Sequence, residues 1–146
     1  MSQRPCSVRG RNGPDPRVKP NPGPSALHVM VVEDDAAVRA HALRVVSGLG
    51  HQVQVADGAD AALAMLAAGG RCDLLMTDVV MPGMSGGRLA LAARAMRPNL
   101  PVLFVTGHSD DPLVAQLRQE GAAVVLFKPY RRAALADAIR RAIGKD

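Results

Sequence analysis

Aromatic residues and cysteine are scarce in this sequence. Only 2% of its 146 residues are aromatic, and tryptophan is absent. Folds that bind single-stranded nucleic acid stack bases on aromatic rings, so this class of protein is disfavoured. The two cysteines, Cys6 and Cys72, are too few for a disulfide framework, and we therefore expect a reducing, cytoplasmic location.

Long apolar stretches are also missing. No run approaches the roughly 18 residues that a membrane-spanning helix needs. The start of the chain lacks the apolar centre of a secretory signal. With 48% hydrophobic and 21% charged residues, the sequence nevertheless has the composition of a globular protein. Its length favours a single domain.

Positive charge and proline are concentrated in residues 1–25. This segment holds five of the 18 basic residues against one acidic residue, and six of the 11 prolines. It has little apolar surface to bury, so we predict a disordered, basic, proline-rich tail followed by one folded domain over residues 26–146. The charge suits nucleic acid or anionic lipid, although a solvated tail without a dedicated partner is the simpler interpretation.

From residue 26 onward, short apolar runs alternate with segments of helical periodicity. The runs have the length and composition of buried strands, and they cover residues 27–32, 52–56, 73–77, 101–106 and 123–127. The alternation predicts an α/β fold, a doubly wound, five-stranded parallel sheet with helices on both faces. In such a sheet, ligands bind at the carboxyl ends of the strands.

Three consecutive acids follow the first predicted strand: Glu33, Asp34 and Asp35. Their mutual repulsion would be relieved by a divalent cation, and ligands that are all oxygen atoms suit magnesium. In the alternative interpretation, Asp35 caps the next helix and the other two acids are solvated.

Single polar residues stand at the ends of three further strands. Asp78 follows the third predicted strand, Thr106 ends the fourth, and Lys128 follows the fifth. Each is weak evidence alone, because a carboxylate or hydroxyl also caps helices. Together with the acids after the first strand, they would bring carboxylate, hydroxyl and ammonium groups to one edge of the sheet.

Four motifs in this order resemble the receiver domain of two-component response regulators. They are VVEDD at residues 31–35, LLMTDVVMPGMSG at 74–86, VLFVTG at 102–107 and FKPY at 127–130. The resemblance covers residues 27–143 and implies the flavodoxin-like strand order 2-1-3-4-5. It also implies that Asp78 accepts a phosphoryl group, whose oxygens Thr106 and Lys128 would bind.

The resemblance further implies a Mg²⁺ site. Asp34 and Asp78 would ligate the ion directly, and the backbone carbonyl of Val80 would complete the protein ligands. Glu33 would contact the ion through a water molecule. Phosphoryl transfer needs an in-line nucleophile and positive charge on the equatorial oxygens, which an aspartate, a cation and a lysine supply.

A signalling role follows from the same resemblance. A histidine kinase would donate the phosphoryl group from a phosphohistidine, and output would pass to an unidentified downstream protein or phosphotransfer protein. Little sequence follows the last predicted helix, so we expect a stand-alone receiver without a DNA-binding domain. We expect no enzymatic activity beyond its own phosphorylation and dephosphorylation, and phosphorylation-dependent dimerisation stays open.

Two positions bear on the alternatives. Receiver domains commonly carry an aromatic switch residue three positions before the lysine, where this chain has Val125, so the form of the conformational change is left open. A small aspartyl-nucleophile phosphatase would need a second aspartate where this chain has Val80. A dinucleotide-binding protein would need a glycine-rich loop after the first strand. A degenerate receiver that binds partners without phosphorylation is disfavoured, because every expected site residue is present.

Overall fold

Five strands and five helices alternate along the chain in the computed structural model, which describes residues 26–107 and 110–144. The strands are β1 (His28–Val32), β2 (Gln52–Ala56), β3 (Leu74–Asp78), β4 (Val102–Thr106) and β5 (Ala123–Phe127). The helices are α1 (Ala36–Gly48), α2 (Ala59–Ala67), α3 (Gly86–Met96), α4 (Pro112–Gln119) and α5 (Arg132–Ala142). The tail predicted over residues 1–25 lies outside the described residues.

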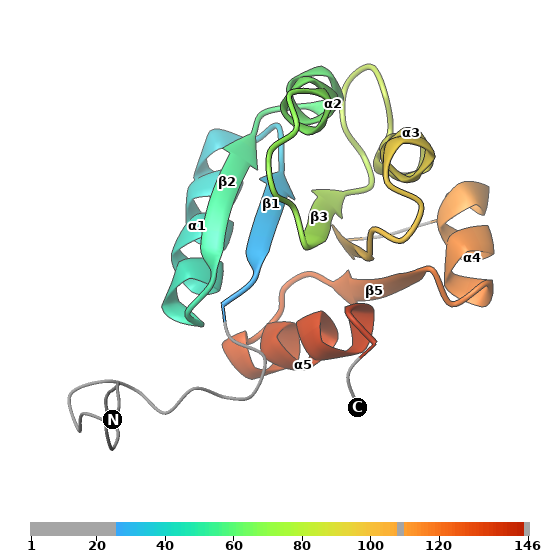
Figure 1. The fold of residues 1–146 in the computed structure, drawn as a ribbon. Coiled ribbons are helices and arrows are strands. Elements are labelled where there is room, and N and C mark those ends of the chain that lie inside the picture. The colour runs from blue at the N-terminus through green and yellow to red at the C-terminus, as the bar shows by residue number, and fades with distance from the viewer. Residues whose placement is uncertain (1–25, 108–109, 145–146) are drawn as a thin grey trace, which may run out of the picture.

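The strands form one parallel sheet in the order β2-β1-β3-β4-β5 (Figure 1). The sequence prediction of a doubly wound sheet is therefore confirmed, as is the order implied by the family resemblance. The chain passes from β1 outward to β2 and then returns to β3 on the other side of β1. This reversal opens a crevice at the carboxyl ends of β1 and β3, where sheets of this kind bind ligands.

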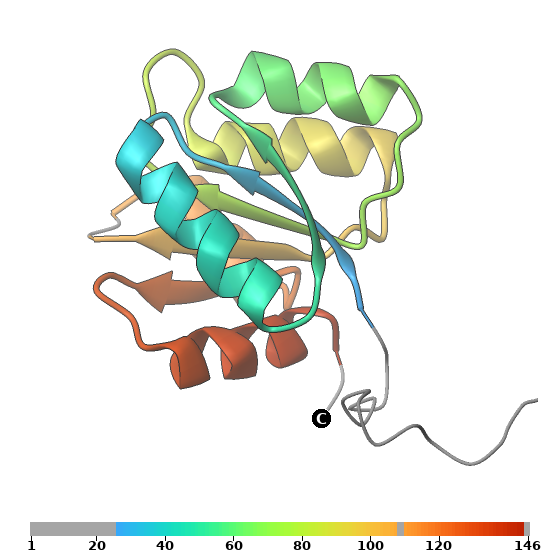
Figure 2. The same ribbon diagram turned by 90° about the vertical axis from the view of Figure 1, so that its left-hand side faces the viewer.

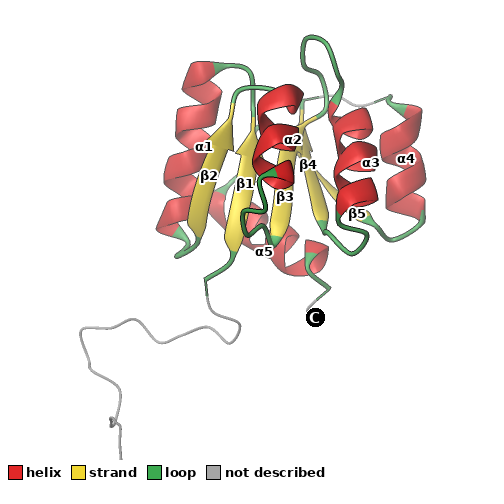
Figure 3. Cartoon of the chain, turned by 45° about the horizontal axis from the view of Figure 1, so that its top comes forward, coloured by secondary structure: helices red, strands yellow, loops and turns green. Residues whose placement is uncertain are grey.

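Helices cover both faces of the sheet. One apolar core lies between the sheet and α2, α3 and α4, and the other lies between the sheet and α1 and α5. Figure 2 shows α2 and α3 side by side on one face, with α5 on the other, and Figure 3 shows α2 in front of the strands. Neighbouring residues of β1 serve opposite cores, with Val31 in one and Val32 in the other, because strand side chains alternate between faces. Burial on both faces explains the uninterrupted apolar runs of the sequence.

Side-chain caps fix the start of three helices. Asp35, Ser85 and Asp111 accept hydrogen bonds from backbone N–H groups in the first turns of α1, α3 and α4. The predicted capping role of Asp35 is therefore confirmed. None of the helices in the described part of the chain is both long and apolar enough to cross a membrane.

Candidate functional site

The sheet brings the predicted strand-end residues to one edge. Asp78 is the last residue of β3 and pairs in register with Val105 of β4, so Asp78 and Thr106 end neighbouring strands. The Lys128 N–H donates to the Thr106 carbonyl at 2.8 Å, which continues the β4–β5 ladder past its last pair. The sequence placed Asp78 just after the third strand, whereas the structure includes it in β3.

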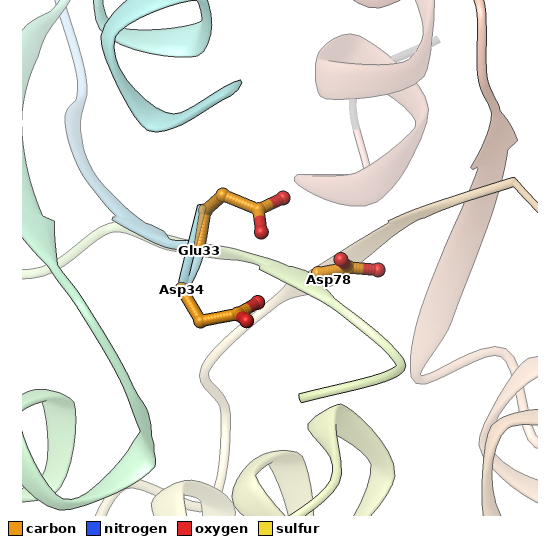
Figure 4. A group of neighbouring side chains, drawn as sticks. All are labelled: Glu33, Asp34 and Asp78. Carbon is orange, nitrogen blue, oxygen red and sulfur yellow. The ribbon is translucent and has the colours of Figure 1, made fainter. Parts of the chain in front are cut away.

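Three carboxylates meet where β1 and β3 end. Glu33, Asp34 and Asp78 each offer an oxygen atom within 4.8 Å of those of the other two (Figure 4). Glu33 is buried, Asp78 is half-buried and Asp34 is exposed. The predicted convergence of the acids is therefore found, and the same arrangement separates Asp35, which caps α1.

Lys128, the residue that follows β5, completes this group. Its Nζ lies 3.2 Å from Glu33 Oε1 and 3.5 Å from Asp78 Oδ2, so one ammonium bridges the carboxylate after β1 and the carboxylate at the end of β3. The remaining carboxylate oxygens also have donors. Asp78 Oδ1 accepts the Val79 N–H at 2.7 Å, and Glu33 Oε2 accepts the Asp35 N–H at 3.1 Å. These bonds hold both carboxylates in fixed orientations.

Burial and charge act differently on the two ends of the Lys128–Glu33 pair. The Glu33 side chain is 7% exposed, and desolvation raises its pKa despite hydrogen bonds from the Asp35 N–H and Lys128. Apolar side chains such as Val38 and Met76 line the same small cavity as Glu33. Burial opposes the charge of Lys128 too, but its side chain is 28% exposed, and the carboxylates of Asp78 and Glu33 outweigh burial and raise its pKa. The charged form of Glu33 therefore lowers the stability of the folded protein.

Glu33→Gln is accordingly expected to raise the melting temperature of the Mg²⁺-free protein at pH 7. The folded-state pKa of Glu33 lies above its ordinary value of 4.5, so the folded protein is stabilised by protonation and loses that stability as pH rises through the folded pKa. The amide imitates the protonated acid at every pH. Thermal melts from pH 4 to pH 8 should show an advantage of the variant that vanishes below about pH 4.5. An advantage that is absent at pH 7 would contradict the cost assigned to this buried charge.

The other predicted site residues occupy suitable places. Thr106 is 1% exposed at the end of β4, next to the Lys128 backbone. Val80 is 71% exposed in the loop after Asp78, and the metal-ligand role of its carbonyl stays a prediction.

Tyr130 does not replace the aromatic switch residue that is missing at position 125. Val125 packs against the core beneath α2, α3 and α4, whereas Tyr130 packs against the core beneath α1 and α5. The Tyr130 ring lies 6.2 Å from the ring of His41, centroid to centroid. The two residues thus serve opposite faces of the sheet, and Tyr130 does not fill the position that Val125 leaves without an aromatic ring.

Two contacts of this site were not anticipated from the sequence. Arg39 of α1 donates to the backbone carbonyl of Glu33 at 2.8 Å. Gly86, the first residue of α3, lies so close to β3 that a Cβ on it would stand 2.0 Å from the Asp78 carbonyl oxygen. The only sequence signals were an arginine one helical turn into α1 and a glycine pair after a proline turn, and both patterns are common in other settings.

A doubly wound 2-1-3-4-5 sheet with three carboxylates and a lysine at its switch point defines a class of α/β domain whose acidic cluster could hold a cation. Comparison with known proteins makes this specific. Residues 29–140 match the response regulator receiver domain family, and the chain belongs to that family. The resemblance drawn from the four sequence motifs is confirmed.

Curated relatives share the receiver region with this chain. The response regulator protein FleR of Pseudomonas aeruginosa is 37% identical over 121 residues, which cover 82% of this chain and 25% of FleR. The transcriptional regulatory protein FixJ of Azorhizobium caulinodans is 37% identical over 125 residues, which cover 84% of this chain and 58% of FixJ. The chain therefore spans about a quarter of one relative and little more than half of the other.

Solved structures agree with this assignment. The FixJ-N crystal structure has a TM-score of 0.70 and 29% identity, and the match covers 82% of this chain and 94% of that one. The chemotaxis protein CheY4 of Vibrio cholerae has a TM-score of 0.71 and 26% identity, with 81% of this chain and 99% of that chain matched. The fold of the domain is thus that of solved receiver proteins over nearly their whole length.

Proposed function

We propose that this receiver domain accepts a phosphoryl group on Asp78 from the phosphohistidine of a histidine kinase and signals through contacts with other proteins. One observation carries the proposal. The Asp78 carboxylate ends β3 within 3.5 Å of Lys128 Nζ and within 4.8 Å of the oxygens of two further acids. A nucleophile, a positive group and a cluster of oxygen ligands therefore share one crevice.

The chemistry needs little else from the protein. An Asp78 oxygen attacks the phosphorus, the phosphorus–nitrogen bond breaks, and its electron pair leaves with the imidazole of the donor, which takes up a proton. Lys128, already beside Asp78 Oδ2, is placed to stabilise the charge on the transferring oxygens. Thr106 ends the adjacent strand, and its hydroxyl would hydrogen-bond the phosphoryl group once it is attached.

The acids of the crevice fit a divalent cation. They offer three carboxylate oxygens at mutual distances that one small ion can span, and Mg²⁺ prefers such ligands. Desolvation and the neighbouring Asp78 charge raise the pKa of Glu33, as expected of a carboxylate whose charge is not fully compensated. Glu33, Asp34 and Asp78, with the Val80 carbonyl, would hold the ion. When bound, Mg²⁺ supplies the positive charge that lets an anionic carboxylate approach an anionic phosphoryl group.

The remaining parts of this proposal concern the location, the domain composition and the downstream partner of the whole protein. We place it in the cytoplasm as a stand-alone receiver with no enzymatic activity beyond its own phosphorylation and dephosphorylation, without an output domain and with an unidentified downstream protein. Support comes from CheY4, whose solved chain is matched over 99% of its length. FleR and FixJ, in contrast, extend well beyond the matched region.

Phosphorylation can be tested by intact mass. Incubation with Mg²⁺ and either acetyl phosphate or a phosphorylated histidine kinase should add one phosphoryl group to the wild type and none to Asp78→Asn. Asp60→Asn is a matched control, because Asp60 is an exposed carboxylate on α2. A wild-type protein that stays unmodified while a known receiver is labelled would favour the degenerate-receiver alternative.

A further inference from the structure

Arg39 makes an unusual contact for a basic residue in the first turns of a helix. Its side chain points back along α1, as helical side chains do, and Nη1 donates to the Glu33 carbonyl at 2.8 Å and to the Asp34 carbonyl at 3.5 Å. A cation at a helix N-terminus is opposed by the helix dipole. Arg39 nevertheless makes no ion pair with any carboxylate in the described ranges, and its guanidinium donates a short hydrogen bond to one backbone carbonyl and a long one to the next.

Those two carbonyls belong to the peptide units on either side of Asp34. Fixing both planes fixes the direction in which the Asp34 side chain leaves the backbone, since side-chain direction follows backbone geometry. The Asp34 carboxylate needs such support from its backbone. It is exposed, and within residues 26–107 and 110–144 it has no hydrogen bond or ion pair of its own. Glu33, in contrast, is held through its carboxylate by Lys128 and the Asp35 N–H.

We propose that Arg39 is a positioning residue for the metal site: by holding the carbonyls on both sides of Asp34, it preorganises that carboxylate toward Glu33 and Asp78. This inference rests on the proposed function, because it assumes that the acids bind Mg²⁺. Figure 4 shows the Asp34 carboxylate turned toward the same space as the other two. Arg39 donates to backbone carbonyls and to no carboxylate in the described ranges, so it acts through the backbone that orients Asp34.

Geometry and charge predict opposite results when Arg39 is replaced. A positive charge near a cation site weakens binding of the cation, so its removal alone would tighten Mg²⁺ binding. Loss of the preorganised loop would weaken binding instead, because the ion must then order Asp34 itself. Arg39→Met keeps much of the apolar stem and removes both charge and donors. The direction of its effect on metal affinity therefore separates the two interpretations.

The test is the affinity of the full chain for Mg²⁺ by calorimetry, and for Mn²⁺ by electron paramagnetic resonance as a spectroscopic substitute. We expect Arg39→Met to raise the dissociation constant about tenfold, at the lower end of effects from outer-shell partners. Arg39→Lys keeps the charge and a flexible ammonium donor group but lacks the planar fork, so it should rescue part of the loss. Arg44→Met is the matched control, because Arg44 is an exposed arginine on the same helix.

Thermal melts without metal separate this role from a general structural one, since the affinity change should appear in variants that melt like the Arg44→Met control. Arg39→Met protein that binds Mg²⁺ as tightly as the wild type, or more tightly, would overturn the positioning role and leave the proposed function intact. Wild-type protein that binds neither ion would overturn the metal site itself, and the Arg39 inference with it.

Discussion

Lys128→Met is expected to slow phosphorylation of Asp78 by about a hundredfold, the scale of losing one preorganised electrostatic contact to a transition state. The Lys128 Nζ already stands 3.5 Å from Asp78 Oδ2, at the place where a transferring phosphoryl group would develop charge. The side chain is bound to Glu33 as well, so its removal leaves two neighbouring carboxylates without their ammonium. The rate should be measured by rapid-quench labelling with a phosphorylated kinase at saturating Mg²⁺.

The same variant should bind Mg²⁺ more tightly than the wild type. Lys128 neutralises part of the charge that attracts the cation, so its loss increases the negative potential of the crevice. A slower reaction with tighter metal binding would separate the roles of lysine and metal in one protein. Arg44→Met again serves as the control for removing one positive charge. An undiminished rate in Lys128→Met would show that the ammonium does not reach the phosphoryl group.

The positions of the reactive groups were predictable because parallel strands align their carboxyl ends. Each apolar run of the sequence ends in a polar residue or is followed by one, and a doubly wound sheet aligns those ends along one edge. Both the polar residue at each strand end and the alignment of those ends follow from the place of a residue along the chain, without knowledge of its side-chain contacts. The convergence of Asp34, Asp78 and Lys128 could therefore be stated before any distance was available.

The contacts that hold these groups could not be read in the same way. Arg39 reaches the Glu33 carbonyl because α1 begins at Ala36, directly after the Asp35 cap, and no periodicity of the sequence encodes that contact. The pKa directions of Glu33 and Lys128 depend on how deeply each side chain is buried, and that follows from packing. Side-chain contacts of this kind arise from tertiary structure, whereas strand ends arise from chain order.

Val125 is a further position at which the sequence identifies a residue but does not reveal the side-chain contacts around it. The sequence correctly indicates that the switch position lacks an aromatic ring, but it does not predict which face of the sheet Tyr130 packs against. The structure puts these residues in separate cores, so movement of one is not transmitted to the other by direct packing. Any conformational response to phosphorylation must therefore use contacts other than an aromatic ring at residue 125.

Gly86→Ala is expected to destabilise the domain by roughly 1–3 kcal/mol, the usual cost of overpacking a filled interior. A Cβ at this position would lie 2.0 Å from the Asp78 carbonyl oxygen and 2.9 Å from the Val79 Cα. Both neighbours are backbone atoms, so no rotamer change relieves the clash. The start of α3 or the end of β3 must move. Such a movement would also disturb the Gly86 N–H bond to the Val79 carbonyl and the Thr77 hydroxyl bond to the Asp78 carbonyl.

Because Asp78 belongs to the strand end that must shift, the variant should lose phosphorylation as well as stability. Urea denaturation measures the first effect, and intact mass after incubation with Mg²⁺ and acetyl phosphate measures the second, at a temperature where the variant is folded. Gly70→Ala is the matched control, since the nearest atom to a Cβ there, the Met65 carbonyl oxygen, is 3.6 Å away. If Gly86→Ala proved as stable and as readily phosphorylated as Gly70→Ala, close packing of α3 against Asp78 would not be what positions this carboxylate.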